Sequence, residues 1–160
     1  MSSTKLEPGA LAPDFQLPTD GDGSFSLSDK KGSIVVLYFY PKDNTPGCTK
    51  ESIAFSQLKP EFDALGASVV GVSPDTAAKH DKFKAKHELN VTLVSDTETT
   101  LCENYGVWVQ KSMFGKKYMG VERSTFLIGA DGHIAKVWRK VKVAGHAEDV
   151  LEAVKDLGTQ

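Results

Sequence analysis

One of the two cysteines in this chain follows a short segment rich in proline and glycine, where a thiol could act as a nucleophile. Cys48 ends the segment PKDNTPGC (residues 41–48), which lies between an apolar run and a set of apolar residues at helical spacing. The start of a helix presents unpaired backbone N–H groups and the positive end of the helix dipole, and both favour a thiolate over a thiol. The sequence therefore predicts a reactive Cys48 in the first helical turn, with Thr45 as the N-cap and Pro46 at the first helical position.

Ionisation alone would not make such a thiol a fast nucleophile. A cysteine whose pKa falls from about 8.5 to about 5.5 gains only about thirtyfold in thiolate at pH 7, and a less basic thiolate attacks more slowly. Other groups must hold and polarise the electrophile. The Thr45 hydroxyl can hydrogen-bond there, Pro41 can shape the loop and exclude water, and the N–H groups of Gly47 and Cys48 are candidate donors.

A cation would complete such a site, and arginine suits because it stays charged and presents its donors in a fixed fork. The chain has two arginines, Arg123 and Arg139. Arg123 directly precedes the predicted strand 124–128, so the sheet would fix its position, and we expect it at the site. The alternative is a surface ion pair with Glu122 or Asp96. We expect Glu51, one turn after Cys48, to cap the helix or pair with Arg123 rather than to transfer a proton.

Composition predicts one globular domain, residues 1–160, in the cytoplasm. The 19 basic and 21 acidic side chains give a net charge of −2, which offers no reason to expect nucleic acid or an anionic membrane as a partner. The N-terminal residues lack the apolar core of a signal peptide, and the apolar run 34–40 is too short to cross a bilayer. Two cysteines do not form a disulfide scaffold, so we expect reduced thiols.

Strand and helix patterns alternate along the chain, which indicates an α/β sandwich around a mixed central sheet. We expect Pro60 to kink or restart the helix that follows Cys48, because proline removes one backbone hydrogen bond. The segment 130–132 predicts a hairpin turn. The predicted strands are 14–17, 25–27, 34–40, 68–73, 91–95, 124–128 and 134–141, and the further predicted helices are 76–87, 98–105 and 147–157.

The motifs resemble those of the peroxiredoxins, in particular the bacterioferritin-comigratory-protein or peroxiredoxin Q branch. The spacing Pro41-x-x-x-Thr45-x-x-Cys48 is similar to the peroxiredoxin active-site pattern, and GVERSTFLI (residues 120–128) is similar to a second motif of that branch. The likeness extends over nearly the whole chain, through APDF (residues 12–15), VSD (residues 94–96) and YGVW (residues 105–108).

This resemblance implies a thioredoxin-like fold and a thiol peroxidase for hydrogen peroxide and organic hydroperoxides, with a role in antioxidant defence and redox homeostasis. The Cys48 thiolate would attack the terminal peroxide oxygen and become a sulfenic acid, with sulfinic acid as the overoxidised product. Thr45, Arg123 and the Cys48 N–H would bind the peroxide, and Pro41 would shield the site. No metal or organic cofactor is required.

The chain departs from its relatives in the cysteine that would resolve the sulfenic acid. Many relatives carry a second cysteine five residues after the first or on the next helix, and these positions are Ile53 and Lys84 here. We expect Cys102 to be a small core residue. The leading hypothesis is therefore a one-Cys cycle in which thioredoxin, glutaredoxin or a low-molecular-weight thiol reduces Cys48. The alternative is a Cys48–Cys102 disulfide, formed by a large rearrangement or between chains.

Two functions from other classes compete with the peroxidase: a redox sensor or holdase chaperone switched by Cys48, and a thioredoxin-like binding module with a silent thiol. We favour the peroxidase because a sensor needs only a thiol, whereas this chain also has Thr45 and Arg123. A monomer is expected, with a dimer as the alternative.

Three further features have a structural and a functional interpretation. The four histidines (His80, His87, His133 and His146) lack metal-ligand spacing, so we predict no metal site. The basic segment 136–142 fits the solvated face of a strand better than a nucleic-acid site. The apolar side chains of segment 113–119 could line a route for bulky hydroperoxides, or could serve loop packing or a protein contact.

Overall fold

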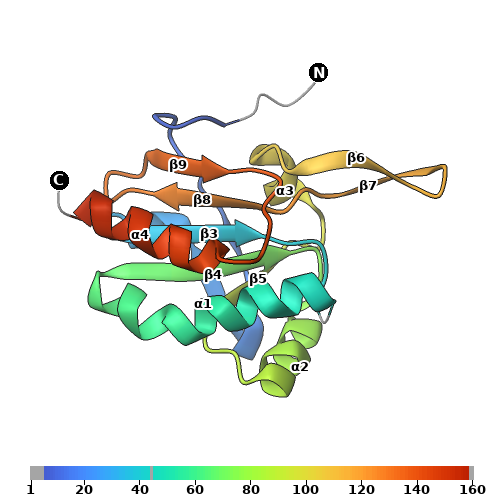
Figure 1. Ribbon diagram of the computed structural model, residues 1–160, viewed down its shortest axis with the longest axis horizontal. Helices are drawn as coiled ribbons and strands as arrows, with labels where there is room; N and C mark the ends of the chain where they lie inside the picture. The colour runs from blue at the N-terminus through green and yellow to red at the C-terminus, as the bar shows by residue number, and fades with distance from the viewer. Residues whose placement is uncertain (1–5, 44, 159–160) are drawn as a thin grey trace.

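A five-stranded sheet forms the centre of the computed structural model, which describes residues 6–43 and 45–158 (Figure 1). The strand order is β5-β4-β3-β8-β9. The central strand β3 (Ile34–Phe39) pairs in parallel with β4 (Ala67–Ser73), which pairs in parallel with β5 (Thr92–Ser95). On its other side, β3 pairs antiparallel with β8 (Ser124–Ile128), and β8 pairs antiparallel with β9 (Ile134–Trp138). The predicted mixed sheet is confirmed.

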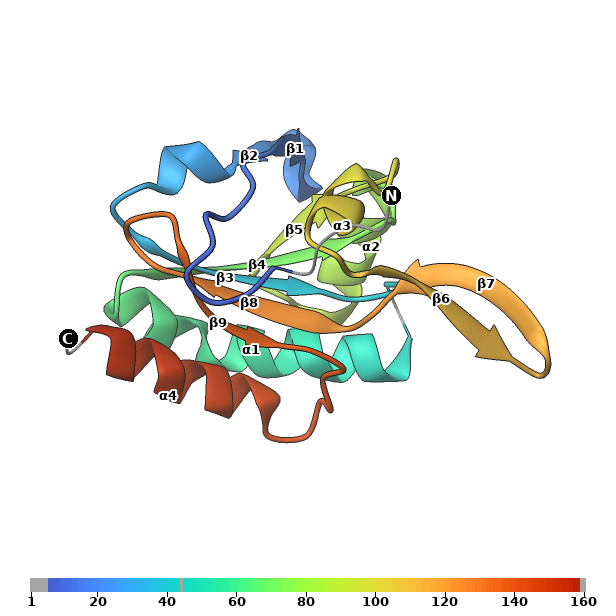
Figure 2. The ribbon, with the colours of Figure 1, turned by 90° about the horizontal axis from the view of Figure 1, so that it is seen from above.

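Both faces of β3 are covered, which explains its nearly continuous apolar sequence. Helices α1 (Pro46–Ala64) and α4 (His146–Gly158) lie against one face, and the small sheet of β1 (Gln16–Pro18) and β2 (Ser24–Ser26) lies against the other (Figure 2). Successive residues of a strand point to opposite faces. Leu37 and Phe39 therefore belong to the core on the β1–β2 side, whereas Val36 and Tyr38 belong to the core under α1 and α4.

The remaining elements close the ends of the sheet. The 3₁₀ turns η1 (Asp20–Asp22) and η2 (Leu27–Lys30) flank β2, and α2 (Ala77–His87) connects β4 to β5. The short helix α3 (Thr100–Asn104) lies on the β1–β2 side and contributes Leu101 and Cys102 to that core. None of the helices in the described parts of the chain is both long and apolar enough to cross a membrane.

Several predicted boundaries were wrong. Helix α1 continues through Pro60, so it does not restart there, and the alternative of a kink at Pro60 stays a prediction. Helix α3 is shorter than predicted because its N-cap, Thr99, takes a left-handed backbone conformation with φ +60°. Strand β9 ends at Trp138, and Lys140 shortly beyond it is also left-handed, with φ +50°.

The largest feature that the sequence analysis missed is the hairpin of β6 (Trp108–Met113) and β7 (Lys116–Val121). It extends away from the body of the protein (Figure 1) and turns through Phe114 and Gly115, which both have positive φ. Four large apolar side chains of the hairpin are exposed, and Phe114 is 97% accessible: Met113, Phe114, Tyr118 and Met119. Their proposed role toward bulky substrates stays a prediction.

Candidate active site

The start of α1 places Cys48 at the carboxyl end of the central strand. Strand β3 ends at Phe39, and the loop that follows, here called the β3–α1 loop (residues 40–45), leads to Pro46 at the first helical position. Cys48 is the third residue of α1, as predicted. Its side chain does not emerge from the surface, because only 1% of it is accessible to solvent. The sulfur therefore lies inside the folded chain, away from bulk water.

Arg123 contacts the Cys48 sulfur directly. Its Nη2 donates a hydrogen bond to Cys48 Sγ over 3.1 Å, and its Nη1 donates to Glu51 Oε1 over 2.6 Å. Arg123 sits in the two-residue connection before β8, and the β3–β8 register pairs Phe39 with Ser124. The sheet thus fixes Arg123 beside the end of β3. Cys48 and Glu51 lie three residues apart on one helix face, so a single guanidinium fork spans both.

Glu51 is the partner that holds this arginine in place. The side chain is 1% exposed, and Oε2 is buried without a hydrogen-bond partner among the described residues. Burial raises the pKa of Glu51 to about 7, although Arg123 acts in the opposite direction. Burial works against the charge of Arg123, but Glu51 and Cys48 together raise the pKa of Arg123. The guanidinium therefore stays positive and close to the sulfur.

Gly47 makes room for the guanidinium. A Cβ atom at this position would lie 3.2 Å from Arg123 Nη2, a tighter approach than ordinary packing allows. The backbone of Gly47 does not have the positive φ that turns often require of glycine. The absence of a side chain, rather than backbone freedom, therefore accounts for glycine beside Cys48.

Thr45 and Pro41 lie in the loop that leads to Cys48. Thr45 is the N-cap of α1, as predicted, with an extended backbone, although its side chain makes no capping hydrogen bond. Instead, Thr45 Oγ1 donates to the Lys42 carbonyl oxygen over 2.9 Å and closes the turn. Pro41 is partly buried where the loop begins. Thus the structure brings Cys48 and Arg123 into contact, while Thr45 and Pro41 lie in the loop that precedes Cys48.

A buried polar network that the sequence analysis missed anchors the same loop. Asp43 accepts a hydrogen bond from the Tyr40 hydroxyl over 2.5 Å and lies 2.6 Å from His80 Nδ1. His80 Nε2 lies 2.9 Å from the Val94 carbonyl oxygen, which can only accept, so Nε2 donates that hydrogen bond. The Asp43 N–H donates to Asp75 Oδ2 over 2.7 Å. These contacts join the loop to α2.

Lys111 on β6 is a further residue near the site that the sequence analysis did not select. Burial lowers the pKa of Lys111, and repulsion from Arg123 adds to this effect, whereas Cys48 and Glu122 oppose it. The side chain thus lies within electrostatic range of the Cys48–Arg123 pair. Only the β6–β7 hairpin, which the sequence analysis read as a loop, brings it there.

The second cysteine lies on the opposite side of the sheet. Cys48 belongs to the core under α1, whereas Cys102 on α3 belongs to the core on the β1–β2 side, where it is fully buried. Burial raises the pKa of Cys102 well above its ordinary range. The two positions where relatives carry a resolving cysteine hold no thiol here. Ile53, a residue of α1, packs against the core under α1 and α4, and Lys84 forms a 2.8 Å ion pair with Asp20.

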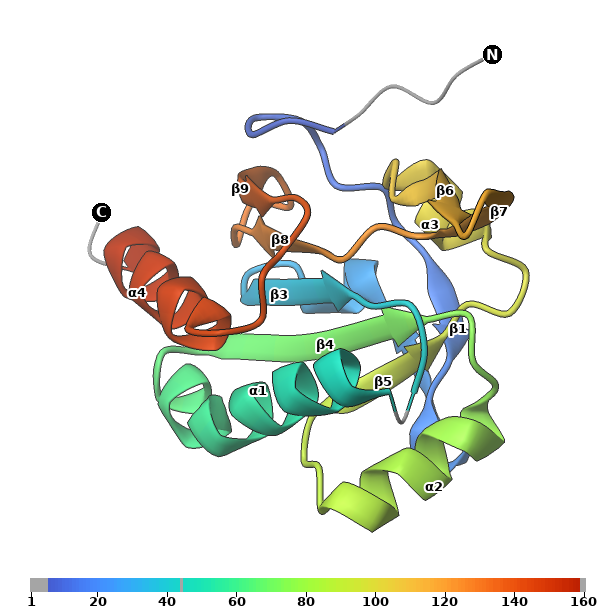
Figure 3. The same ribbon diagram turned by 45° about the vertical axis from the view of Figure 1, so that its right-hand side comes forward.

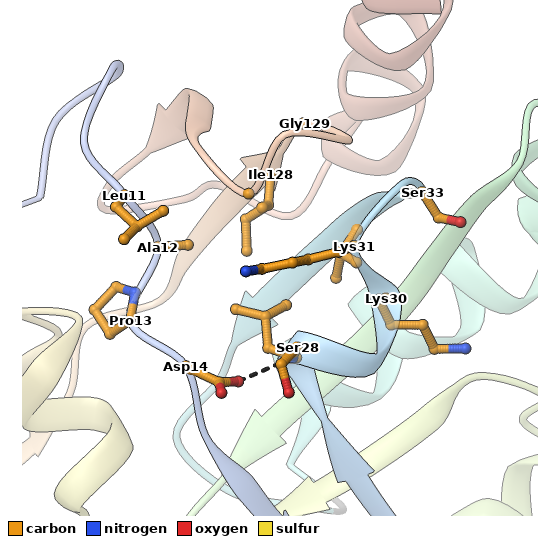
Figure 4. Close-up of a pocket in the computed structure, with 13 residues that line it drawn as sticks. Leu11, Ala12, Pro13, Asp14, Ser28, Lys30, Lys31, Ser33, Ile128 and Gly129 are labelled. Carbon is orange, nitrogen blue, oxygen red and sulfur yellow. Dashed lines mark hydrogen bonds between the residues drawn. The ribbon is translucent and has the colours of Figure 1, made fainter.

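A separate cavity of about 200 Å³ lies at the other end of the sheet (Figure 4). It is lined by Val35 near the start of β3, by Ile128 at the end of β8, and by Leu11 and Pro13. Cys48 follows the carboxyl end of β3, so this cavity takes no part in its chemistry. The described residues contain no cluster of histidine, cysteine and carboxylate side chains that could hold a metal ion.

His146 provides a prediction on pH dependence. Its Nε2 lies 2.7 Å from Thr125 Oγ1, and burial lowers the pKa of His146 to about 4, with Asp149 opposing and Arg123 assisting this shift. Because the folded pKa lies below the ordinary value of about 6.5, this group contributes full stability above pH 6.5, and the contribution is lost as the pH falls toward 4. We expect the melting temperature to fall across that window, and less steeply for His146→Gln.

Thermal unfolding followed by circular dichroism between pH 7 and pH 4.5 measures this difference. His133→Gln is the matched control, since His133 is exposed. Equal slopes for wild type and His146→Gln would contradict the assignment.

Comparison with known proteins places the chain in a family. Residues 8–137 match the AhpC/TSA family. Over 152 residues the chain is 50% identical to peroxiredoxin Bcp of Bacillus subtilis, covering 95% of this chain and 97% of that protein. A putative peroxiredoxin bcp of Coxiella burnetii is 51% identical over 146 residues, covering 91% and 97%. The chain belongs to the peroxiredoxin Q branch of the AhpC/TSA family. It is a thiol-dependent peroxidase.

Solved structures of other peroxiredoxins agree with this fold. The bacterioferritin comigratory protein of Xanthomonas campestris, studied for its alkyl peroxide reduction activity, is 43% identical with a TM-score of 0.88, covering 98% of this chain and 99% of that one. Peroxiredoxin Q of Xylella fastidiosa is 41% identical with a TM-score of 0.91, covering 96% and 98%. The expected thioredoxin-like fold is therefore confirmed.

Proposed function

We propose that Cys48 is the residue of this peroxiredoxin that reacts with peroxide and that Arg123 is its principal electrostatic partner. The observation that carries the proposal is the 3.1 Å hydrogen bond from Arg123 Nη2 to Cys48 Sγ. The same guanidinium can stabilise the thiolate before reaction and the negative charge that develops on the departing oxygen during it. Thr45 and Pro41 hold the β3–α1 loop around the incoming peroxide and limit the entry of water.

The proposed reaction consumes one thiolate and one hydroperoxide. The sulfur attacks the terminal peroxide oxygen, the O–O bond breaks, and the departing oxygen takes up a proton and leaves as water or an alcohol. Cys48 becomes a sulfenic acid. We propose hydrogen peroxide and organic hydroperoxides as substrates, and the alkyl peroxide reduction activity studied in the Xanthomonas campestris relative supports the latter.

We further propose a one-Cys cycle in which an external thiol reduces the sulfenic acid. Cys102 is buried on the far side of the sheet, and residues 53 and 84 are isoleucine and lysine, so the folded chain offers Cys48 no thiol within reach. Thioredoxin, glutaredoxin or a low-molecular-weight thiol would supply the electrons. The enzyme would act as a single-domain monomer in the cytoplasm, in antioxidant defence and redox homeostasis.

Cysteine variants test this cycle. We expect Cys48→Ser to lose peroxide consumption entirely and Cys102→Ser to keep wild-type rates with either dithiothreitol or thioredoxin and its reductase, because Cys102 is sequestered from the site. Mass spectrometry after one equivalent of peroxide should show one added oxygen on Cys48 and no disulfide. Wild-type turnover by Cys48→Ser would overturn the assignment, and a Cys48–Cys102 disulfide would overturn the one-Cys cycle.

A further inference from the structure

Four lysines gather beside the β3–α1 loop. Lys42 from the loop and Lys79, Lys82 and Lys86 from α2 line a pocket of about 260 Å³ with Phe83 in its wall, and these four lysines are here called the lysine surface. Positions 79, 82 and 86 have the three- and four-residue spacing that puts side chains on one helix face. All four lysines are exposed, and together they make a strongly positive region on a chain of net charge −2.

The ammonium groups of the lysine surface are not neutralised by ion pairs within the described parts of the chain. In residues 6–43 and 45–158, none of the four lysines takes part in an ion pair. The two carboxylates in the pocket wall, Asp43 and Asp75, are buried and hydrogen-bonded within the protein. Clustered like charges repel each other. A partner that carries negative charge would remove this repulsion and bind here in preference to other surfaces.

The lysine surface is physically joined to the site of oxidation. The Lys42 carbonyl oxygen accepts a hydrogen bond from the hydroxyl group of Thr45, which lies three residues before Cys48. Asp43, the next residue along the loop, forms the 2.6 Å contact with His80, which lies on α2 between the lysines. Figure 3 shows α2 on the same side of the sheet as the start of α1. A molecule that binds the lysines is therefore held next to the loop that leads to Cys48.

We infer that the lysine surface is the docking site for the acidic face of the dithiol protein that reduces oxidised Cys48. This inference rests on the one-Cys cycle proposed above. A protein fits better than a small anion because the lysines are exposed and extend over about 10 Å of helix, more than one small anion can span. Complementary charge also steers the encounter of two proteins and raises the association rate.

The chemistry of the docked complex is a thiol exchange. One partner thiolate attacks the Cys48 sulfur, an S–S bond forms as the S–O bond breaks, and the hydroxide takes up a proton and leaves as water. The second partner thiol then loses its proton and attacks its neighbouring sulfur, which releases the Cys48 thiolate. The partner ends as an internal disulfide, two electrons poorer, and the peroxidase is reduced.

Charge reversal of the helix lysines tests the inference. The variant Lys79→Glu/Lys82→Glu/Lys86→Glu is expected to lower kcat/KM for a thioredoxin of net negative charge at least about tenfold. Its rate of oxidation by peroxide and its turnover with dithiothreitol, which is neutral, should stay within twofold of wild type. Raising the salt concentration should slow thioredoxin-dependent turnover of the wild type and have little effect on the variant.

The basic segment 136–142, which overlaps the end of β9, offers a matched control, Lys136→Glu/Lys140→Glu/Lys142→Glu, with the same change in net charge. It should keep kcat/KM for thioredoxin. An unchanged kcat/KM in the α2 variant, or an equal loss in both variants, would overturn the docking site. Failure of the proposed cycle looks different, because mass spectrometry of the oxidised wild type would then show a Cys48–Cys102 disulfide, whatever the α2 variant does.

Discussion

Replacement of Arg123 by methionine should slow the reaction of Cys48 with hydrogen peroxide about 10³-fold, because one well-placed donor to a developing charge is worth that much in enzymes. The variant loses both the 3.1 Å contact with Sγ and the charge that favours the thiolate. Stopped-flow measurement of a single oxidation, without any reductant, isolates this step from the rest of the cycle.

The controls separate the loss of chemistry from the loss of folding. Arg123→Met leaves Glu51 buried without its cation, so the double variant Arg123→Met/Glu51→Gln, which removes the stranded charge, should fold well and be equally slow. Arg139→Met removes the other arginine, which donates to the Leu6 carbonyl oxygen away from the sulfur, and should keep the oxidation rate. If Arg123→Met were oxidised by hydrogen peroxide as fast as the wild type, the backbone N–H groups and Thr45 would suffice to activate Cys48 without the arginine.

The second large effect concerns the anchor of the β3–α1 loop. We expect His80→Leu to lower the free energy of unfolding by about 3 kcal/mol, because it leaves the buried Asp43 carboxylate without its partner. The double variant His80→Leu/Asp43→Asn should recover part of the loss, since no charge is then stranded. Urea denaturation followed by circular dichroism measures the three free energies.

His133→Leu serves as the control for this experiment, since His133 is exposed and its contact with Asp131 is a 3.5 Å surface pair. Its effect should stay within about 0.5 kcal/mol. An equally small effect of His80→Leu would mean that the network does not stabilise the fold.

The sequence alone was sufficient to predict the central strand and the position of Cys48 at the start of a helix. An apolar run before a proline–glycine turn has few other interpretations, and the spacing of apolar residues predicted α1. The position of Arg123 at the site could be predicted because the chain has only two arginines and one of them directly precedes a strand. Glu51 was recognised as a partner of Arg123 because helical spacing puts it one turn after Cys48.

The contact between Asp43 and His80 could not be predicted in this way. The two residues lie 37 positions apart, and only the parallel register of β3 with β4, which pairs Phe39 with Val72, brings the following loops together. The β6–β7 hairpin was missed for a different reason. Its strands are exposed and mix lysines with apolar residues, so no single buried face imposes the alternation that marks a strand.

Gly47 has a consequence for attempts to make this enzyme more robust. Stabilisation schemes commonly replace loop and helix glycines by alanine wherever φ is negative, because alanine restricts the unfolded chain. Gly47 passes that filter, yet a Cβ atom at this position would lie only 3.2 Å from Arg123 Nη2. An alanine chosen for thermal tolerance would therefore force the guanidinium to move by a few tenths of an ångström, and the substitution would alter the contact between the cation and the sulfur.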